Sequence, residues 1–474
     1  MVSLNPGAHI HLIGIGGAGL SAIALVLLER GFKVSGSDRK FSTMAQHVET
    51  AGARVFLGHH AENVAGADLV VQSSAVSDDN VEVRSAHSLR IPILKRAEFL
   101  SQVTAGYQTI AVAGTHGKTT TTAMLSWILT ELGQDPSYVI GGVSVDLGRN
   151  AHAGKGSIFV IEADEYDYTF LGLRPDIAVV TNVEHDHPDC YPSPEDFHLA
   201  FQKFVARLTP DGILVACQDD PGAAKLSVEA AALPGRAVIT YGLSEDSSKT
   251  DLNYVGFQLE VMKKSGYAFK VVKDGDLIAQ VYLQVPGRHN VYNGLAALVV
   301  VDQLGLNLGK AAEALGKYHG TGRRFEVRGE VNRIIVVDDY AHHPTEIRAT
   351  LAAARQRYPE RRIWAVWQPH TYSRTRLYFN EFTTAFEEAD FVVVTEVYPA
   401  REPVRSDLSA RDVVSAMQHP NVRFIATLEQ VIANLLTSLL PGDVLVVLSA
   451  GDADQISTEV LGSLMQEERV HDAK

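Results

Sequence analysis

Residues 111–122, AVAGTHGKTTTT, place a loop bounded by two glycines and followed by Lys-Thr between an apolar stretch and a helix-forming run. Such a loop can turn several backbone N–H groups toward one anion, and the helix behind it directs the positive end of its dipole to the same place. Lys118 adds a positive charge against nucleotide phosphates, and Thr119 offers a hydroxyl to Mg²⁺. The expected phosphate site consists of Gly114, Thr115, His116, Gly117, Lys118, Thr119 and Thr120. The feature requires a strand, a loop and a helix in that order, and therefore an α/β fold.

The spacing of the two glycines is unusual. The common phosphate loop, G-x-x-x-x-G-K-[ST], separates its glycines more widely than Gly114 and Gly117 are separated here. The chain therefore carries a compressed version of the motif. A strand-to-helix turn that only happens to contain Gly-Lys-Thr is the alternative interpretation.

Composition limits the classes of protein to which the chain can belong. With 474 residues, of which 46% are hydrophobic and 21% charged, the chain is a globular protein of about three domains. Its net charge of −14, without a long basic block, disfavours nucleic acid or an anionic membrane as the main partner. Two cysteines cannot form a disulfide framework, and the longest apolar run near the N-terminus is too short to span a bilayer. We expect a cytoplasmic protein without an export signal.

Strands and helices alternate in three successive units, which predicts parallel sheets with crossover helices. Strands of the first unit are expected at His9–Ile13, Lys33–Ser37 and Leu69–Gln72, with helices at Leu20–Arg30 and from about Thr43. The second unit has expected strands near Thr109, Ser157–Glu162 and Ile177–Thr181, a helix at Thr120–Leu132 and an antiparallel insert within Tyr254–Val285. The third unit begins near Arg333, has helices after Pro344 and Ser373, and ends with a strand at Val444–Ser449. The predicted domains are residues 1–103, 104–320 and 321–474. The first and last are Rossmann-like, and the central one is a P-loop-type mononucleotide-binding domain.

A second glycine motif, IGIGGAGLS, lies at residues 13–21. Gly14, Gly16 and Gly19 form a G-x-G-x-x-G directly after the first strand, and Asp38 ends the next strand, where a ribose-binding acid is expected. A bound NAD is the default interpretation, although an NAD enzyme has no obvious need for a second phosphate loop. Alternatively, the glycines only allow a helix to pack closely on a strand.

Two polar runs follow predicted strands of the central unit. EADEYD at 162–167 places several carboxylates at a strand end, where Mg²⁺ is the natural cation beside a phosphate loop, and a solvated acidic loop is the alternative. TNVEHDHPD at 181–189 contains His185, Asp186, His187 and Asp189. Zinc is a weak interpretation of this second run because the spacing of a metal finger is absent.

Four further motifs lie in the second half of the chain: GRHNVYNGLAA at 287–297, GRRFE at 322–326, DDYAHHPTE at 338–346 and QPHTYSRT at 368–375. Either Arg323 or Arg324 could neutralise the charge of transferring phosphates. Asp339 is expected at a strand end of the third domain, and Arg374 is suited to bidentate binding of a carboxylate. Taken singly, each of these residues could equally serve packing or the surface.

Together these motifs resemble the Mur ligase family, the ATP-dependent amino-acid-adding enzymes of bacterial peptidoglycan synthesis. The resemblance extends along nearly the whole chain, and the family's compressed GxxGK[ST] loop accounts for the unusual glycine spacing. Within the family, IGIGGAG is typical of the alanine-adding branch. This branch implies UDP-N-acetylmuramate and L-alanine as substrates, with ATP and Mg²⁺ as cofactors, in a monomer or a homodimer. It also implies activation of the substrate carboxylate as an acyl phosphate, which the amine then attacks.

The resemblance also assigns residues to the substrates and the metal. The UDP-sugar would lie at Gly14, Gly16, Gly17, Gly19, Asp38 and Ser73. Mg²⁺ would be held by Thr119, Glu162 and His187, with Glu165 as the substitute if the acidic run is displaced. The amino acid would lie near His342, His370 and Arg374.

ATP would be bound by the phosphate loop and by residues from both later domains. Asn290 and Asn293 would meet the adenine, while Arg324 and Asp339 would couple domain closure to assembly of the site. The implied catalytic residues are Lys118, His187, Arg324 and His342.

Two departures from the family pattern keep alternatives open. Thr371 stands where many members have arginine, which removes one potential anion contact. Tyr166 stands where alanine-adding members often have serine, and it also occurs in the related ligase that recycles a murein tripeptide. That ligase is the first alternative; an NAD-dependent oxidoreductase and a P-loop protein that uses ATP only as a switch are the others.

Overall fold

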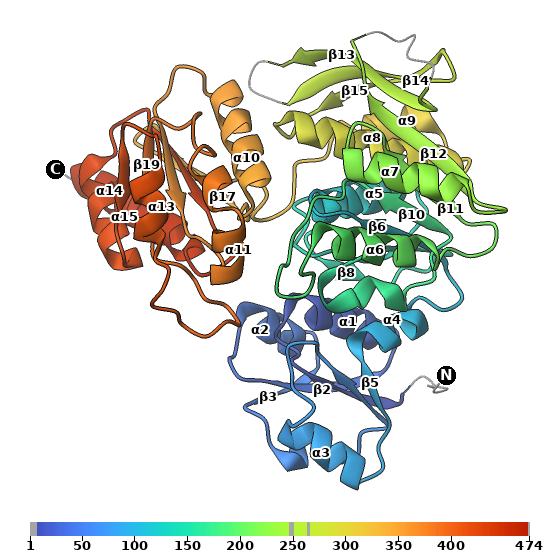
Figure 1. Cartoon of the computed structure of the whole chain (residues 1–474). Coiled ribbons are helices and arrows are strands. Elements are labelled where there is room, and N and C mark those ends of the chain that lie inside the picture. The colour runs from blue at the N-terminus through green and yellow to red at the C-terminus, as the bar shows by residue number, and fades with distance from the viewer. Residues whose placement is uncertain (1–6, 246–250, 263–265, 473–474) are drawn as a thin grey trace.

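The computed structural model describes residues 7–245, 251–262 and 266–472. Figure 1 shows three lobes, with the N-terminal lobe in blue, the central lobe in green and yellow, and the C-terminal lobe in orange and red. Each lobe is built around its own sheet, which confirms the predicted three-domain α/β architecture. The exact boundaries near residues 103 and 320 stay predictions.

The N-terminal sheet is entirely parallel, with the strand order β3-β2-β1-β4-β5 that is expected of a Rossmann-like domain. Its strands are β1 (His9–Ile13), β2 (Lys33–Asp38), β3 (Arg54–Leu57), β4 (Leu69–Gln72) and β5 (Ile93–Lys95). Its α-helices are α1 (Ala18–Glu29), α2 (Thr43–Thr50), α3 (Val81–Ser88) and α4 (Arg96–Val103). β1 and β4 are almost completely buried, as short apolar strands are when helices cover both faces of a sheet.

The central sheet has ten strands in the order β15-β14-β13-β12-β11-β10-β6-β9-β7-β8. These strands are β6 (Gln108–Ala113), β7 (Ser137–Val139), β8 (Ala151–His152), β9 (Ile158–Glu162), β10 (Ile177–Val180), β11 (Ile213–Cys217), β12 (Ala237–Leu243), β13 (Tyr254–Val261), β14 (Tyr267–Lys273) and β15 (Asp276–Leu283). Its helices are α5 (Lys118–Glu131), η2 (Tyr166–Gly172), α6 (Pro194–Val205), α7 (Pro221–Ala231), α8 (Arg288–Gln303) and α9 (Leu308–Leu315).

The predicted antiparallel insert corresponds to β13, β14 and β15. It is not a separate sheet, because β13 pairs in parallel with β12 and so extends the central sheet. The turn between β14 and β15 contains Asp274 and Gly275, both at positive φ, which suits a tight hairpin connection.

The C-terminal sheet has the order β16-β17-β21-β18-β19-β20 and is parallel except for β16. Its strands are β16 (Glu326–Val331), β17 (Ile334–Asp339), β18 (Ile363–Trp367), β19 (Phe391–Val394), β20 (Val422–Phe424) and β21 (Val444–Leu448). Its helices are α10 (Pro344–Arg357), α11 (Tyr372–Leu377), α12 (Phe379–Phe382), α13 (Ala410–Ala416), α14 (Leu428–Ser438) and α15 (Asp454–Asp472). The start predicted near Arg333 was too late, because the charged edge strand β16 lacks the apolar run that marks the buried strands.

The N-terminal and central domains share an apolar core, whereas the C-terminal domain has its own. One continuous buried cluster joins the first two domains and includes Leu12 of β1, Phe99 of α4 and Phe159 of β9. The C-terminal domain has separate clusters on the two faces of its sheet, around Trp367 and Trp364. In the part of the chain that the structure describes, no helix combines the length and apolarity needed to cross a membrane.

This division of the core predicts two unfolding units. Phe159 and Trp367 are both completely buried, so each change to alanine should cost about 3–5 kcal/mol. In scanning calorimetry, Trp367→Ala is expected to lower mainly the transition of the C-terminal domain, and Phe159→Ala mainly that of the other two domains. A single transition that both variants lower equally would contradict the prediction.

Candidate active site

The phosphate loop connects β6 to α5 and depends on two glycine conformations. Gly114 and Gly117 have φ values of 138° and 82°. A Cβ atom at Gly114 would lie 2.0 Å from the Thr181 hydroxyl oxygen, and one at Gly117 would lie 2.5 Å from the Asn293 amide oxygen. Both glycines are therefore needed for backbone conformation and for space, which explains why the compressed loop keeps them.

Lys118, the first residue of α5, turns its side chain back over the loop. Its Nζ donates to the carbonyl oxygens of Gly114 (2.6 Å) and Thr115 (3.0 Å) and to the Glu165 carboxylate (2.9 Å). Burial favours the neutral amine, but the nearby carboxylates, Glu165 first, outweigh it and raise the pKa of Lys118. The amine thus stays protonated where nucleotide phosphates are expected.

The residues expected around Mg²⁺ form two adjoining pairs. Thr119 Oγ1 donates to Glu162 Oε1 (3.0 Å), while His187 Nε2 lies 3.5 Å from Glu165 Oε1. Burial raises the pKa of Glu162, so a cation beside this carboxylate would relieve an unfavourable charge. Within the described residues, His187 Nδ1 is buried without a hydrogen-bond partner. A hydroxyl, two carboxylates and an imidazole fit Mg²⁺, which commonly takes few protein ligands and completes its shell with water and phosphate.

A pocket of about 300 Å³ lies beside the loop, between the central and C-terminal domains. It contains several residues predicted to bind ATP, namely His116, Gly117, Thr119, Thr120, Asn290, Asn293, Arg324 and Asp339. Asn290 and Asn293 lie together in the first turns of α8, where the Asn293 amide donates to Asn290 Oδ1 (3.0 Å).

The lining also includes residues that the sequence analysis did not select: His289 and Tyr292 of α8, Asp219 and Asp220 after β11, and Glu346 of α10. Two signals could have identified them. His289 and Tyr292 lie inside the GRHNVYN motif, and the two aspartates directly follow a parallel strand, where ligands gather.

Arg324 brings a guanidinium from the domain boundary to the phosphate loop. Its Nη2 lies 3.5 Å from Thr119 Oγ1, its Nη1 lies 3.8 Å from Glu346 Oε1, and its Cζ lies 5.0 Å from the ring centroid of Tyr340. Asp339 accepts backbone hydrogen bonds from Phe325 and Ala341, both at 2.7 Å. Asp339 therefore fixes the chain that carries Arg324 into the pocket.

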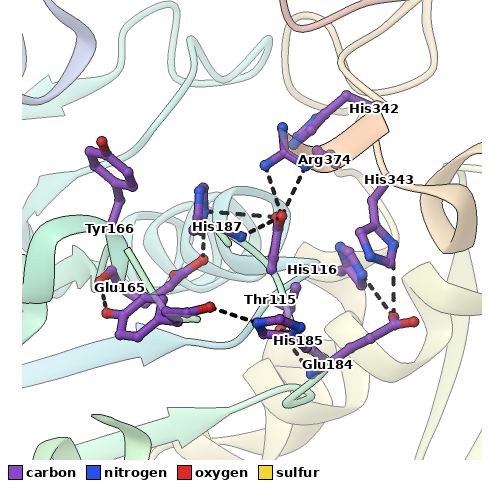
Figure 2. A network of polar contacts seen from close by, with 12 residues as sticks. Thr115, His116, Glu165, Tyr166, Glu184, His185, His187, His342, His343 and Arg374 are labelled. Atoms are coloured by element: carbon purple, nitrogen blue, oxygen red, sulfur yellow. Dashed lines mark hydrogen bonds and ion pairs between the residues drawn. The ribbon is translucent and has the colours of Figure 1, made fainter. Parts of the chain in front are cut away.

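His116 links the phosphate loop to the C-terminal domain. One ring nitrogen lies 3.1 Å from Glu346 of α10 and the other lies 3.0 Å from Glu184 of the central domain. Figure 2 shows His116 and His343 directed toward Glu184. Burial disfavours the charged ring, yet the carboxylates of Glu346 and Glu184 prevail and raise the pKa of His116 to about 9. The phosphate-loop histidine is thus an imidazolium held by carboxylates of two domains.

Among the described residues, one group of three side chains has the spacing to hold a metal ion. It consists of His116, Glu184 and His343, whose possible ligand atoms all lie within 4.8 Å of one another. Protein groups contact three of its four imidazole nitrogens, and His343 Nε2 is buried without a hydrogen-bond partner among the described residues. Both nitrogens of His116 face carboxylates, and His343 Nδ1 accepts the backbone N–H of Thr345 (3.3 Å) at the start of α10. His185, considered for zinc, bonds the carbonyl oxygen of Tyr191 (2.8 Å) instead.

The three residues predicted to bind the amino acid lie together in the C-terminal domain. Arg374 is 2% exposed, and its Nε (2.9 Å) and Nη2 (2.8 Å) contact Asp186 Oδ1 across the interface with the central domain. Its Nη1 donates to His370 Nδ1 (3.0 Å), and the rings of His370 and His342 lie 5.7 Å apart. Burial lowers the pKa of His342 to about 3 and that of His370 to about 2, so both rings are neutral.

Thr371 occupies the position where many family members have arginine. Its φ is 67°, and its hydroxyl accepts the backbone N–H of Arg374 (3.4 Å) as the N-cap of α11. The threonine therefore orders the first turn of the helix that carries Arg374. The prediction of a helix after Ser373 was late by two residues for this reason, since α11 begins at Tyr372.

The first glycine motif forms a tight loop between β1 and α1. Gly14 has φ 89°, and a Cβ atom there would lie 2.9 Å from Ser73 Cβ, so Ser73 packs directly against the loop. Asp38 Oδ2 accepts the Gly16 N–H (3.0 Å), and Gly17 is the N-cap of α1. The structure thus brings the residues predicted for the UDP-sugar to one end of the N-terminal sheet.

The His116 contact predicts a titration with a defined sign. Because the folded-state pKa of about 9 lies above the ordinary 6.5, the contact stabilises the protein fully below pH 6.5 and loses this effect as the pH rises through 9. NMR of ¹³C-labelled histidines, assigned with a His116→Gln variant, should show a midpoint near 9 that falls in Glu346→Gln. The exposed Glu360→Gln control should leave it unchanged, and a wild-type midpoint near 6.5 would contradict the prediction.

Family models match three successive parts of the chain. They are described as the Mur ligase family catalytic domain (residues 9–108), the Mur ligase middle domain (112–301) and the Mur ligase glutamate ligase domain (323–451). These ranges follow the order of the three sheets.

Curated relatives match over nearly the full length. A UDP-N-acetylmuramate--L-alanine ligase of Roseiflexus sp. (strain RS-1) is 40% identical over 97% of this chain and 100% of its own length. One of Solidesulfovibrio magneticus is 43% identical over 97% of this chain and 99% of its own.

Solved structures also match the chain over nearly its whole length. A UDP-N-acetylmuramate-alanine ligase of Thermotoga maritima has a TM-score of 0.81 at 30% identity, covering 98% of this chain and 100% of its own. A murein peptide ligase of Psychrobacter arcticus has a TM-score of 0.72 at 27% identity, covering 97% and 99%. On its sequence, its fold and the order of its three domains, the chain belongs to the Mur ligase family.

Proposed function

We propose that this protein joins L-alanine to the carboxylate of UDP-N-acetylmuramate in a reaction driven by ATP. The central support from the structure is the approach of Arg324 to Thr119 (3.5 Å), which completes the phosphate site from a second domain. The full-length relatives named for this activity support the choice of substrates. We place the reaction in the cytoplasmic synthesis of peptidoglycan precursors, which serves cell wall biogenesis, cell shape and cell division.

The first step activates a carboxylate, because its oxygen is a poor leaving group. A carboxylate oxygen of UDP-N-acetylmuramate attacks the γ-phosphorus of ATP, ADP departs, and an acyl phosphate results. Lys118 and Arg324 are placed to stabilise the negative charge that spreads over the transferring phosphoryl group. Mg²⁺, held by Thr119, Glu162 and His187 together with Glu165, would supply further charge neutralisation on the phosphates.

The second step forms the amide bond. The amine of L-alanine attacks the acyl carbon, a tetrahedral intermediate forms, and phosphate leaves. We assign the carboxylate of L-alanine to Nη1 of Arg374 and to His370, because Asp186 already occupies Nε and Nη2 of the guanidinium and Nη1 lies beside His370. His342, whose pKa is lowered to about 3 by burial, is a weak base, and its role is to orient the substrate through a neutral ring.

The tripeptide-recycling ligase is the first alternative. Tyr166 favours it, and the murein peptide ligase of Psychrobacter arcticus is a structural neighbour. The TM-score of the UDP-N-acetylmuramate-alanine ligase of Thermotoga maritima, 0.81, exceeds the 0.72 of the murein peptide ligase. This difference favours the alanine-adding interpretation. An NAD oxidoreductase would leave Lys118 and the acidic run without a role.

Release of phosphate tests the proposal directly. With ATP and Mg²⁺, release should require UDP-N-acetylmuramate and L-alanine together, and mass spectrometry should find the alanyl product. Lys118→Ala should lower kcat about 10²- to 10³-fold because it removes one donor that stabilises transition-state charge. The exposed Lys225→Ala on α7 is the matched control. Activity with a tripeptide in place of L-alanine would transfer the assignment to the recycling ligase.

Arg374→Lys tests the amino-acid site. Lysine keeps the charge but loses the planar fork, so KM for L-alanine should rise about tenfold or more while KM for ATP changes less than about twofold. Arg376→Lys, on the same helix but in an exposed pair with Asp407, is the control. An equal rise in both KM values would reject the assignment of Arg374 to the amino acid.

A further inference from the structure

Arg96 joins the first glycine loop to the acidic run of the central domain. It is the first residue of α4, which Figure 1 shows beside α1, where the N-terminal lobe meets the central lobe. Its Nη2 donates to Asp164 Oδ2 (2.7 Å) and to Thr169 Oγ1 (2.8 Å), both in the central domain. The side chain is only 14% exposed. Its guanidinium is therefore fixed between two domains.

The other side of this guanidinium lies against Gly19. A Cβ atom at Gly19 would lie 2.2 Å from Nη1 of Arg96 and 3.3 Å from its Cζ. In many dinucleotide-binding folds, the third glycine of the motif lets the helix pack closely on a strand. In this protein the space that Gly19 leaves open is occupied by a positive charge.

The electrostatics around Arg96 favour an anion at this place. Helix α1 begins at Ala18 behind Gly17, without a side-chain cap and without an acidic residue in its first turn. Arg96 also stands at the positive end of its own helix, where a cation is unfavourable unless an anion compensates. Asp164 supplies one such anion. In the described part of the chain, Nε of Arg96 is buried without a hydrogen-bond partner.

We propose that Arg96 binds the diphosphate of the nucleotide-sugar substrate and, through Asp164, fixes the acidic run relative to that substrate. The inference rests on the proposed function, because it concerns how the first substrate is bound. Asp164 lies between Glu162 and Glu165, so a shift of Asp164 moves the carboxylates next to Thr119 and Lys118. Arg96 is thus a binding residue for the diphosphate and a positioning residue for phosphoryl transfer.

Calorimetric titration of the full chain tests the binding role. Arg96→Ala should weaken UDP-N-acetylmuramate and UDP by about 10- to 100-fold, the effect of losing hydrogen bonds to a charged group. Its affinity for uridine, which has no phosphate, and for ADP should change less than about twofold. Arg96→Lys should recover part of the loss, and Arg84→Ala on the exposed face of α3 should behave as wild type.

Unchanged UDP affinity in Arg96→Ala would overturn the inference, as would an equal loss for uridine, which would indicate a disturbed domain. A wild-type protein that does not bind UDP-N-acetylmuramate would instead reject the proposed function. These two failures are therefore distinguishable.

Asp164→Asn tests the link to phosphoryl transfer. This variant keeps Arg96 but removes the charge that joins it to the acidic run, so kcat should fall about tenfold or more while UDP affinity changes less than about threefold. A loss of UDP affinity as large as that in Arg96→Ala, with kcat unchanged at saturating substrate, would overturn the positioning role.

Discussion

The imidazolium of His116 between Glu346 and Glu184 is the contact on which the assembled site depends. It joins the phosphate loop to the first turn of α10, and the same carboxylate of Glu346 lies 3.8 Å from Arg324. The largely buried charges of His116 and Glu346 are favourable only when they are held together, because each would otherwise be left without a partner in a poorly hydrated site. The loop, the bound phosphates and Arg324 are therefore expected to assemble as one unit.

The two domain interfaces differ in their chemistry. The N-terminal and central domains share one apolar cluster, which resembles the interior of a single domain. The central and C-terminal domains meet through polar contacts such as Arg374 with Asp186 and Arg401 with Asp189. Polar interfaces between domains are the ones that commonly open and close. The arrangement suits an enzyme whose phosphate and amino-acid sites are each completed across the same polar interface.

The sequence allowed much of the site to be predicted because its residues occur in compact motifs after strands. The glycine loops, Lys118, Arg324 and Arg374 were all selected from such motifs. Their partners were not predicted: Glu346 and Glu184 lie inside quoted motifs but were not selected, and Asp186 was considered only as a metal ligand. Nothing in the local pattern indicates which distant cation each carboxylate meets. Arg96 was missed altogether, since a single arginine at a helix start carries no signal until the chain folds around it. The edge strand β16 was missed because its charged, exposed residues lack the apolar run of a buried strand.

By itself, the sequence determined the class of fold, the order of the three domains, and the local conformation of the loop between β6 and α5. These properties depend on local patterns: apolar runs form buried strands, and glycines allow backbone conformations that other residues resist. The tertiary structure decided which charges meet across the domains, including His116 with Glu346, Arg374 with Asp186, and Arg96 with Asp164 and Gly19. The hydrogen-bonded residues in these contacts are 68 to 230 positions apart in the sequence. Their interaction energies therefore arise only after the chain has folded.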